Sequence, residues 1–120
     1  MRHLKSTKKF KRTPEERKRL WIDLSKALIK HGKITTFTAR AKWMRPKMER
    51  LITYCKRHKD NEVMALRLLR RYLSEDLAKK LFREIAPKYY DITGGYTAVY
   101  ELSTVYNQMP KSIVTCSGNL

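Results

Sequence analysis

The sequence contains few cysteines, few acidic residues and no long apolar run, and each shortage excludes a class of protein. Two cysteines in 120 residues provide no disulfide framework, which indicates a reducing compartment. No apolar run approaches the roughly 18 residues that a membrane span requires. Residues 1–12 lack the apolar segment of a secretory signal, so we expect no secretion.

Residue patterns that carry catalysis are also missing. The sequence contains no glycine-rich phosphate loop, no nucleophile motif and no paired carboxylates suited to acid–base chemistry, so we predict that the chain is not an enzyme and has no cofactor. Cys55 and His58 are the only closely spaced pair of strong metal-ligand types, whereas a structural zinc site needs four ligands. We therefore predict no metal site.

Positive charge is abundant, and it is unevenly distributed. The chain carries 28 Lys and Arg against 11 Asp and Glu, a formal net charge of +17. Residues 1–60 hold 20 basic and 5 acidic side chains, net +15, and residues 61–120 hold 8 and 6, net +2. A charge of this size indicates a polyanionic partner, with nucleic acid as the first candidate and an anionic membrane surface as the second.

Residues 1–12 form the most basic segment, with six Lys or Arg and no acidic residue. The segment has neither helical nor strand periodicity and too few apolar residues to fold alone. We interpret it as an arm that orders against phosphates, since each neutralised phosphate releases a counterion. Residues 13–120 then form one folded domain, because a chain of this length has room for a single core.

Two helices are predicted in the first half of that domain. Thr13-Pro14-Glu15-Glu16 is typical of a helix start and Gly32 of a helix end, which predicts a helix over residues 14–31. A β-favouring segment, 34–37, precedes a second helix over residues 39–58, with Thr38 as its cap and Pro46 causing a kink or marking the start. The predicted apolar faces are Leu20, Leu24, Ala27, Leu28 and His31 in the first helix, and Ala41, Met44, Met48, Leu51, Ile52 and Cys55 in the second.

The second half mixes helix and strand signals. Asp60 or Asn61 is expected to cap a third helix that continues to about residue 73, with Met64, Leu68 and Tyr72 aligned. Ser74 is expected to cap a fourth, which carries Leu77, Leu81 and Ile85 on one face and ends at Pro87. Strand signals at 34–37, 97–102 and 112–117 then predict an α+β fold, with about four helices packed on a small three-stranded sheet. Trp21 and Trp43 lie beside apolar stripes and are predicted to be packing residues.

Several blocks resemble one family when they are read in order. They include Met1-Arg2-His3, Ala41-Lys42 with Arg45-Pro46, Leu51-Ile52-Thr53, the run from Leu81 to Tyr89, and Gly94-Gly95-Tyr96-Thr97. Together, over residues 1–102, the sequence resembles the bacterial-type large-subunit ribosomal protein L17 family. It departs from the family at Ala98, where a basic residue is usual, and at Ala39, where proline is often found.

The resemblance implies a structural component of the large ribosomal subunit, which binds and stabilises large-subunit rRNA near the peptide exit side. It also implies neighbouring large-subunit proteins as partners, and a start at Met1 without a transit peptide favours the bacterial cytoplasm over an organelle. Charge and resemblance together predict the following RNA-binding residues: Arg2, His3, Lys5, Ser6, Lys8, Lys9, Lys11, Arg12, Arg17, Lys18, Lys33, Thr35, Thr36, Arg40, Lys42, Arg45, Lys47, Arg50, Gly94, Gly95, Tyr96 and Thr97.

Two alternatives stay open at this point. A DNA-binding architectural protein also combines a basic arm with helices, although the strand-like 34–37 segment is unlike the short turn of a helix-turn-helix. Tyr96 either stacks on an RNA base or packs in the core after a plain glycine turn.

Overall fold

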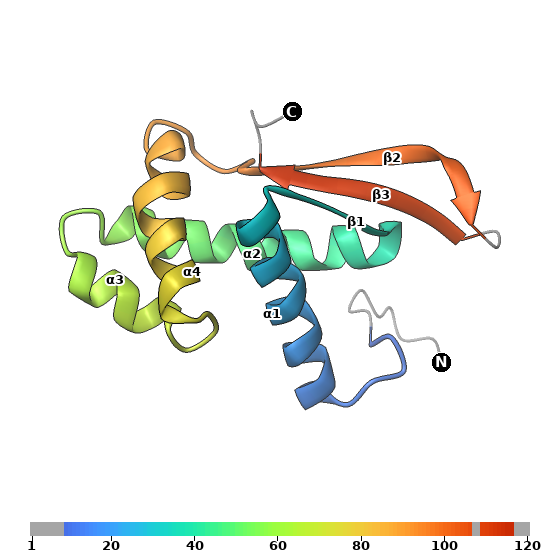
Figure 1. Cartoon of the computed structure of the whole chain (residues 1–120), viewed down its shortest axis with the longest axis horizontal. Helices are drawn as coiled ribbons and strands as arrows, with labels where there is room; N and C mark the ends of the chain where they lie inside the picture. The colour runs from blue at the N-terminus through green and yellow to red at the C-terminus, as the bar shows by residue number, and fades with distance from the viewer. Residues whose placement is uncertain (1–8, 107–108, 117–120) are drawn as a thin grey trace, which may run out of the picture.

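The computed structural model describes residues 9–106 and 109–116, and it confirms the predicted α+β architecture. The helices are α1 (Pro14–His31), α2 (Thr38–Arg57), α3 (Glu62–Leu69) and α4 (Glu75–Lys80), and α4 continues into a π-helical turn (Leu81–Ile85) and a 3-10 turn (Ala86–Tyr89). The strands are β1 (Lys33–Phe37), β2 (Thr97–Tyr106) and β3 (Met109–Cys116) (Figure 1).

The sheet places the last strand in its middle. Its order is β1-β3-β2, and both pairings are antiparallel. Ile34 pairs with Val114 and Val99 pairs with the same residue from the other side, so these three side chains share the face that packs toward the helices. The β2–β3 ladder shifts register between Glu101 and Val105.

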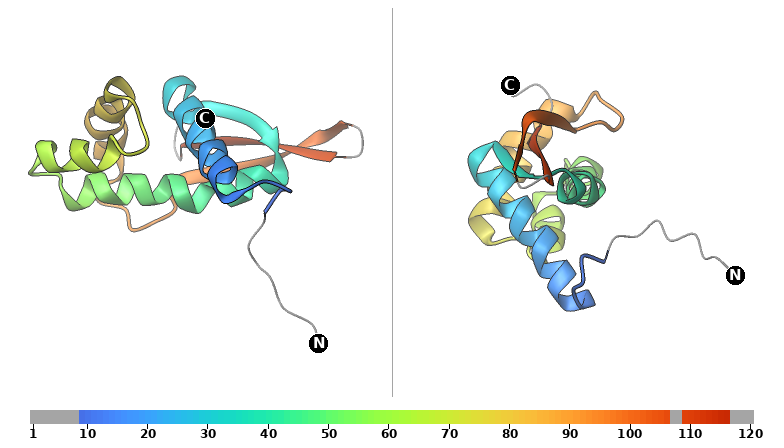
Figure 2. Two further views of the ribbon diagram at one scale, coloured as in Figure 1. Left: turned by 90° about the horizontal axis from the view of Figure 1, so that it is seen from below. Right: turned by 90° about the vertical axis from the view of Figure 1, so that its right-hand side faces the viewer.

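Helix α2 is the central element of the fold. It contacts α1, α3, all three strands and the two turns that follow α4. The sheet and α1 lie along its first half, and α3 and α4 lie at its second half (Figures 1 and 2). All six residues of its predicted apolar face are buried. The alternative that α2 starts near Pro46 is wrong, because the helix begins at Thr38.

Helix ends follow the predicted chemistry in most places. Thr13 accepts a hydrogen bond from the Glu16 amide, and Gly32 ends α1 in the left-handed conformation with φ of 82°. Asn61 caps α3 through its side chain. Thr38 does not cap α2, because its hydroxyl hydrogen-bonds the Ser112 hydroxyl at 2.6 Å inside the core.

Three other predicted features are wrong in whole or in part. On the predicted α1 face, Leu28 is buried and Leu24 packs against the core, but His31 is exposed and burial extends to Ser25 and Ile29. Helix α3 ends at Leu69 and buries Ala65, Leu66 and Leu69 in place of the predicted face. Pro87 does not end a helix but lies inside the 3-10 turn, where proline needs no backbone donor at the first positions.

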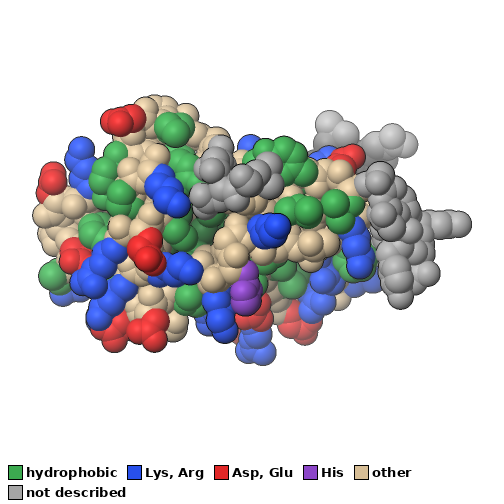
Figure 3. All heavy atoms as spheres, turned by 45° about the horizontal axis from the view of Figure 1, so that its top comes forward, with side chains coloured by type: hydrophobic (Ala, Val, Ile, Leu, Met, Phe, Trp, Pro, Cys, Tyr) green, Lys and Arg blue, Asp and Glu red, His purple; other side chains and the backbone are tan. Residues whose placement is uncertain are grey.

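The hydrophobic core joins the helices to the inner face of the sheet. Its largest fully buried side chains include Met44, Met48, Ile52, Leu81 and Val114. On the face shown in Figure 3, hydrophobic side chains gather over the sheet, and acidic and basic side chains alternate over α3 and α4. In the described ranges, no helix is both long and apolar enough to cross a lipid bilayer.

Candidate RNA-binding surface

The part of helix α2 that lies outside the core carries two rows of side chains, which differ in how their cations are contacted. Residues three or four apart lie on the same side of a helix. One row faces β2 and the loop before it, and its cations are engaged within the protein. The other row holds basic and aromatic side chains, which we call the cationic stripe: Arg40, Trp43, Lys47, Arg50, Tyr54 and Arg57.

The row that faces β2 is held by protein contacts. Lys42 pairs with Glu101 at 3.7 Å, and Arg45 pairs with Glu49 at 3.5 Å. Lys56 donates a hydrogen bond to the Tyr96 hydroxyl at 2.8 Å, which lowers the pKa of Tyr96. Exposed ion pairs of this kind contribute only about 0–1 kcal/mol. Phosphates can therefore displace them, although these cations are less available than unpaired ones.

The cationic stripe has no comparable neutralisation. Arg40 lies 5.5 Å from the centre of the Phe37 ring, and the Lys47 ammonium lies 5.3 Å from that of Trp43. Within the part of the chain that the structure describes, none of the four stripe cations forms an ion pair with an acidic side chain. Unpaired cations interleaved with aromatic rings are typical of surfaces that bind single-stranded nucleic acid.

The end of the basic arm is attached to this stripe. Phe10 packs edge-on against Trp43, with 5.1 Å between ring centres. The Arg12 amide donates to the Lys9 carbonyl at 3.0 Å, and an Arg17 guanidinium nitrogen donates to the Arg12 carbonyl at 2.6 Å. Residues 9–12 therefore form a turn that packs on α2 through Phe10, and Lys9, Lys11 and Arg12 are exposed in it.

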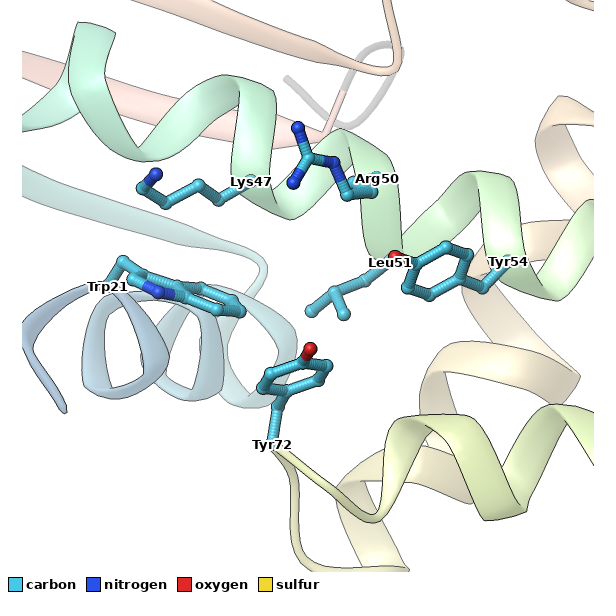
Figure 4. Close-up of a pocket in the computed structure, with 6 residues that line it drawn as sticks. All are labelled: Trp21, Lys47, Arg50, Leu51, Tyr54 and Tyr72. Carbon is cyan, nitrogen blue, oxygen red and sulfur yellow. The ribbon is translucent and has the colours of Figure 1, made fainter. Parts of the chain in front are cut away.

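A notch opens between α1, α2 and the segment after α3. Trp21, Lys47, Arg50, Leu51, Tyr54 and Tyr72 line it, and its volume is about 110 Å³ (Figure 4). The Trp21 and Tyr72 rings are 5.1 Å apart and inclined at 48°. Lys18 adds a charge on the α1 side, because its ammonium lies 5.8 Å from the centre of the Tyr72 ring.

A second groove lies on the far side of Arg50 and Tyr54. It is lined by α2 residues and by the glycine turn, including Arg57, Thr93 and Gly94. Gly94 and Gly95 both have positive φ, at 83° and 66°, a conformation that glycine adopts without steric cost. This turn brings the backbone of Gly94 to the edge of the groove, and RNA contact by the two glycines stays a prediction.

The structure separates the predicted site residues into groups. Lys47 and Arg50 line the notch and Lys18 lies beside it. Arg17 holds the turn of residues 9–12, and Arg40 lies over the Phe37 ring at the start of α2. Lys33 and Thr35 are exposed on the outer face of the sheet, whereas Thr36 alternates toward the inner face and is half-buried. Arg2, His3, Lys5, Ser6 and Lys8 lie outside the described residues.

Tyr96 and Thr97 occupy core positions. Tyr96 is 5 % exposed and packs on Tyr89, with 5.4 Å between ring centres. Thr97 is 2 % exposed and bonds Glu49 through both its amide and its hydroxyl. Base stacking by the Tyr96 ring is therefore excluded in this conformation, and the core alternative is confirmed.

Sequence reasoning missed Tyr54, Arg57 and Tyr72 as surface candidates. The spacing of Lys47, Arg50, Tyr54 and Arg57 along one helix side is a signal that the sequence contains. Tyr72 joins Trp21 only through the fold, because it was assigned to the apolar face of a longer third helix. Trp21 and Trp43 both pack against the core as predicted, but each is only half-buried, so part of each side chain remains accessible at the surface.

Among the residues described, no three His, Cys, Asp or Glu side chains lie close enough together to hold a metal ion. Both cysteines are buried as free thiols. Burial raises the pKa of Cys55 to about 12, so this thiol is protonated and inert near neutral pH.

Comparison with known proteins identifies the family. The sequence model described as "Ribosomal protein L17" matches residues 20–116. The "Large ribosomal subunit protein bL17" of Persephonella marina is 45 % identical over 104 residues, which cover 85 % of this chain and 82 % of that protein. The protein of the same name from Thermus thermophilus is 43 % identical over 104 residues, which cover 86 % of each chain. The chain therefore belongs to the ribosomal protein L17 family.

Proposed function

We propose that this chain is a structural, non-enzymatic component of the large ribosomal subunit, and that it binds and stabilises large-subunit rRNA. The ribosomal role follows from the family, whose members are named as large-subunit proteins. The observation that carries the RNA contact is the cationic stripe, which presents four cations without acidic partners beside the turn of a basic arm. As in bacterial members, the place of action is the ribosome in the cytoplasm.

The mechanism of stabilisation is charge neutralisation with little sequence reading. Each Lys or Arg that contacts a phosphate releases a condensed counterion, so binding weakens as salt rises. Arg adds a bidentate fork for phosphate oxygens. Arg40, Lys47, Arg50 and Arg57 lie along one side of a 20-residue helix, which at about 1.5 Å per residue provides a straight row of contacts for an RNA backbone.

Salt dependence of binding tests this proposal. Affinity for a transcript of bacterial large-subunit rRNA is measured at several salt concentrations for the full chain, for Arg50→Gln and for Arg67→Gln. Arg67 is a matched control, because it is exposed on α3 and also has no acidic partner among the described residues. We expect Arg50→Gln to flatten the slope of log affinity against log salt by about 0.7–0.9, and Arg67→Gln to leave it unchanged.

Two results would contradict the proposal. One is an affinity that barely changes with salt, which would remove phosphate contacts as its basis. The other is stronger binding to duplex DNA of equal length in competition, which would favour the architectural DNA-binding alternative. The location near the peptide exit side, which the family resemblance implies, is tested by cross-linking the chain within assembled subunits and identifying the proteins and rRNA segments attached to it.

A further inference from the structure

We infer that the notch beside the cationic stripe receives a single unstacked nucleobase of the bound RNA, while the stripe cations contact the phosphates on either side of it. The inference rests on the proposed function and specifies the RNA feature that the site recognises. Its basis is the combination of aromatic faces, unpaired polar atoms, small size and cationic rim at one place.

The notch offers flat apolar contact from separate segments. Trp21 comes from α1 and Tyr72 from the segment that follows α3, and their rings lie on the opposite side of the notch from α2 (Figure 4). Leu51 closes the space between them, and it is only 1 % exposed. Base–aromatic stacking requires an exposed ring face, and surfaces that bind unpaired RNA provide such faces with Trp, Tyr and Phe.

Polar atoms in the notch lack partners within the protein. The hydroxyls of Tyr54 and Tyr72 both point toward Leu51 in the middle of the notch (Figure 4). Neither hydroxyl bonds any other described residue, whereas the indole nitrogen of Trp21 lies at the end of its ring away from the two hydroxyls (Figure 4). The edge of a nucleobase carries donors and acceptors that match two phenols, and an aliphatic side chain would leave both hydroxyls unpaired.

The notch is large enough to hold one aromatic ring system but too small to hold a base pair. Its volume is about 110 Å³, and a closed apolar cavity of roughly 150 Å³ accommodates one benzene ring. Because the notch is open on one side, the edge of a larger base can extend into solvent. A stacked duplex cannot insert here, so the RNA must present a base from a loop, a bulge or an end.

The rim of the notch places charge where the flanking phosphates would lie. Lys47 and Arg50 are three residues apart on α2, and Lys18 lies on the α1 side at 5.8 Å from the Tyr72 ring. Of the residues that the structure describes, none that lines the notch is acidic. A rim that carries only positive charge favours a nucleotide over a protein segment with few acidic residues, which would gain nothing from that charge.

Fluorescence of Trp21 provides the direct test. The chain has two tryptophans, so Trp43→Phe leaves Trp21 as the only one and keeps an aromatic ring against Phe10. We expect a transcript of large-subunit rRNA to quench Trp21 emission as it binds. If binding occurs without quenching, or if quenching requires added large-subunit proteins and not RNA, the inference is overturned, and in the second case a protein side chain occupies the notch.

Affinity measurements separate this inference from the proposed function. Trp21→Leu and Tyr72→Leu remove aromatic faces but no charge, so we expect each to weaken binding roughly tenfold and to leave the salt slope unchanged. Tyr100→Leu is the matched control, because Tyr100 is 47 % exposed on the outer face of the sheet, away from the notch. Thermal unfolding verifies that each variant is folded.

The possible outcomes are distinct. Wild-type affinity and salt slope in both notch variants would refute the base pocket and leave the proposed function intact. A wild-type chain that does not bind the transcript at all would refute both. An equal loss in Tyr100→Leu would also overturn the inference, since it would show that aromatic loss weakens binding at any position.

Discussion

Glu49 connects α2 to the start of β2, and its replacement by alanine should destabilise the fold strongly. Its carboxylate accepts hydrogen bonds from the Thr97 amide at 3.2 Å and from the Thr97 hydroxyl at 3.0 Å, and Arg45 lies 3.5 Å away. Thr97 is 2 % exposed, so in the folded protein its amide and hydroxyl depend on this acceptor. Hydrogen bonds to charged groups contribute about 1.5–3 kcal/mol, and an orphaned buried donor costs about 1–3 kcal/mol.

The expected loss for Glu49→Ala is therefore about 3 kcal/mol of the free energy of unfolding. The ion pair with Arg45 adds little, because the side chain of Arg45 is 43 % exposed and such pairs contribute at most about 1 kcal/mol. In a domain of this size, 1 kcal/mol moves the midpoint by roughly 4 °C, so Tm should fall by about 12 °C. Glu49→Gln keeps one carbonyl acceptor and should lose about 1 kcal/mol.

Thermal unfolding followed by far-UV circular dichroism measures this effect. Glu84→Ala is the matched control, since it removes the same charge from an exposed position without an ion pair to any described residue. The reasoning fails if Glu49→Ala and Glu84→Ala melt within about 2 °C of each other, a difference that corresponds to only about 0.5 kcal/mol.

Three further predictions concern the core, a helix end and the arm. Burial raises the pKa of Cys55 from 9.0 to about 12, so the free energy of unfolding should fall by about 1.4 kcal/mol per pH unit as pH rises from 9 to 12. Denaturant titrations should show a smaller fall for Cys55→Ala. The methyl group added by Gly32→Ala would meet no atom within 4 Å, but the backbone keeps φ at +82°, so the free energy of unfolding should fall by about 1–2 kcal/mol. Denaturant titration should show a smaller fall for Gly32→Asn. Phe10→Ala removes the ring contact with Trp43 and should lower rRNA affinity with little change in Tm, whereas an equal affinity would show that the turn does not position the arm.

Most of the fold is predictable because its helices carry strong local signals. The cap at Thr13, the stop at Gly32 and the six-residue apolar face of α2 all operate within a few residues, and the structure confirms them. The apolar face of α3 was not predictable to the same degree. Its eight residues span little more than two turns, so several faces fit the pattern and tertiary packing selects one.

The sheet and the candidate surface depend on contacts between distant residues. The side chain of Thr38 is of a type that can cap a helix, but its hydroxyl instead hydrogen-bonds the Ser112 hydroxyl, 74 residues away. Arg45 and Glu49 are four residues apart on α2, so the sequence contains the signal for their ion pair. Lys42 pairs with Glu101 of β2, and only the position of that strand distinguishes it from the unpaired Lys47 and Arg50. Tyr72 and Trp21 approach each other from separate elements, so no sequence spacing predicts their contact.

The central position of β3 determines when the fold can be completed during synthesis. Both strands that flank it precede it along the chain, and the pairing of Lys33 with Thr115 must wait until the later residue has been made. Contacts of such long sequence separation close slowly. Until then β1 and β2 present unpaired backbone groups, a state prone to association between chains. A nascent chain can thus form its basic helices before its sheet, and loss of the final strand would remove the pairing partner of both other strands at once.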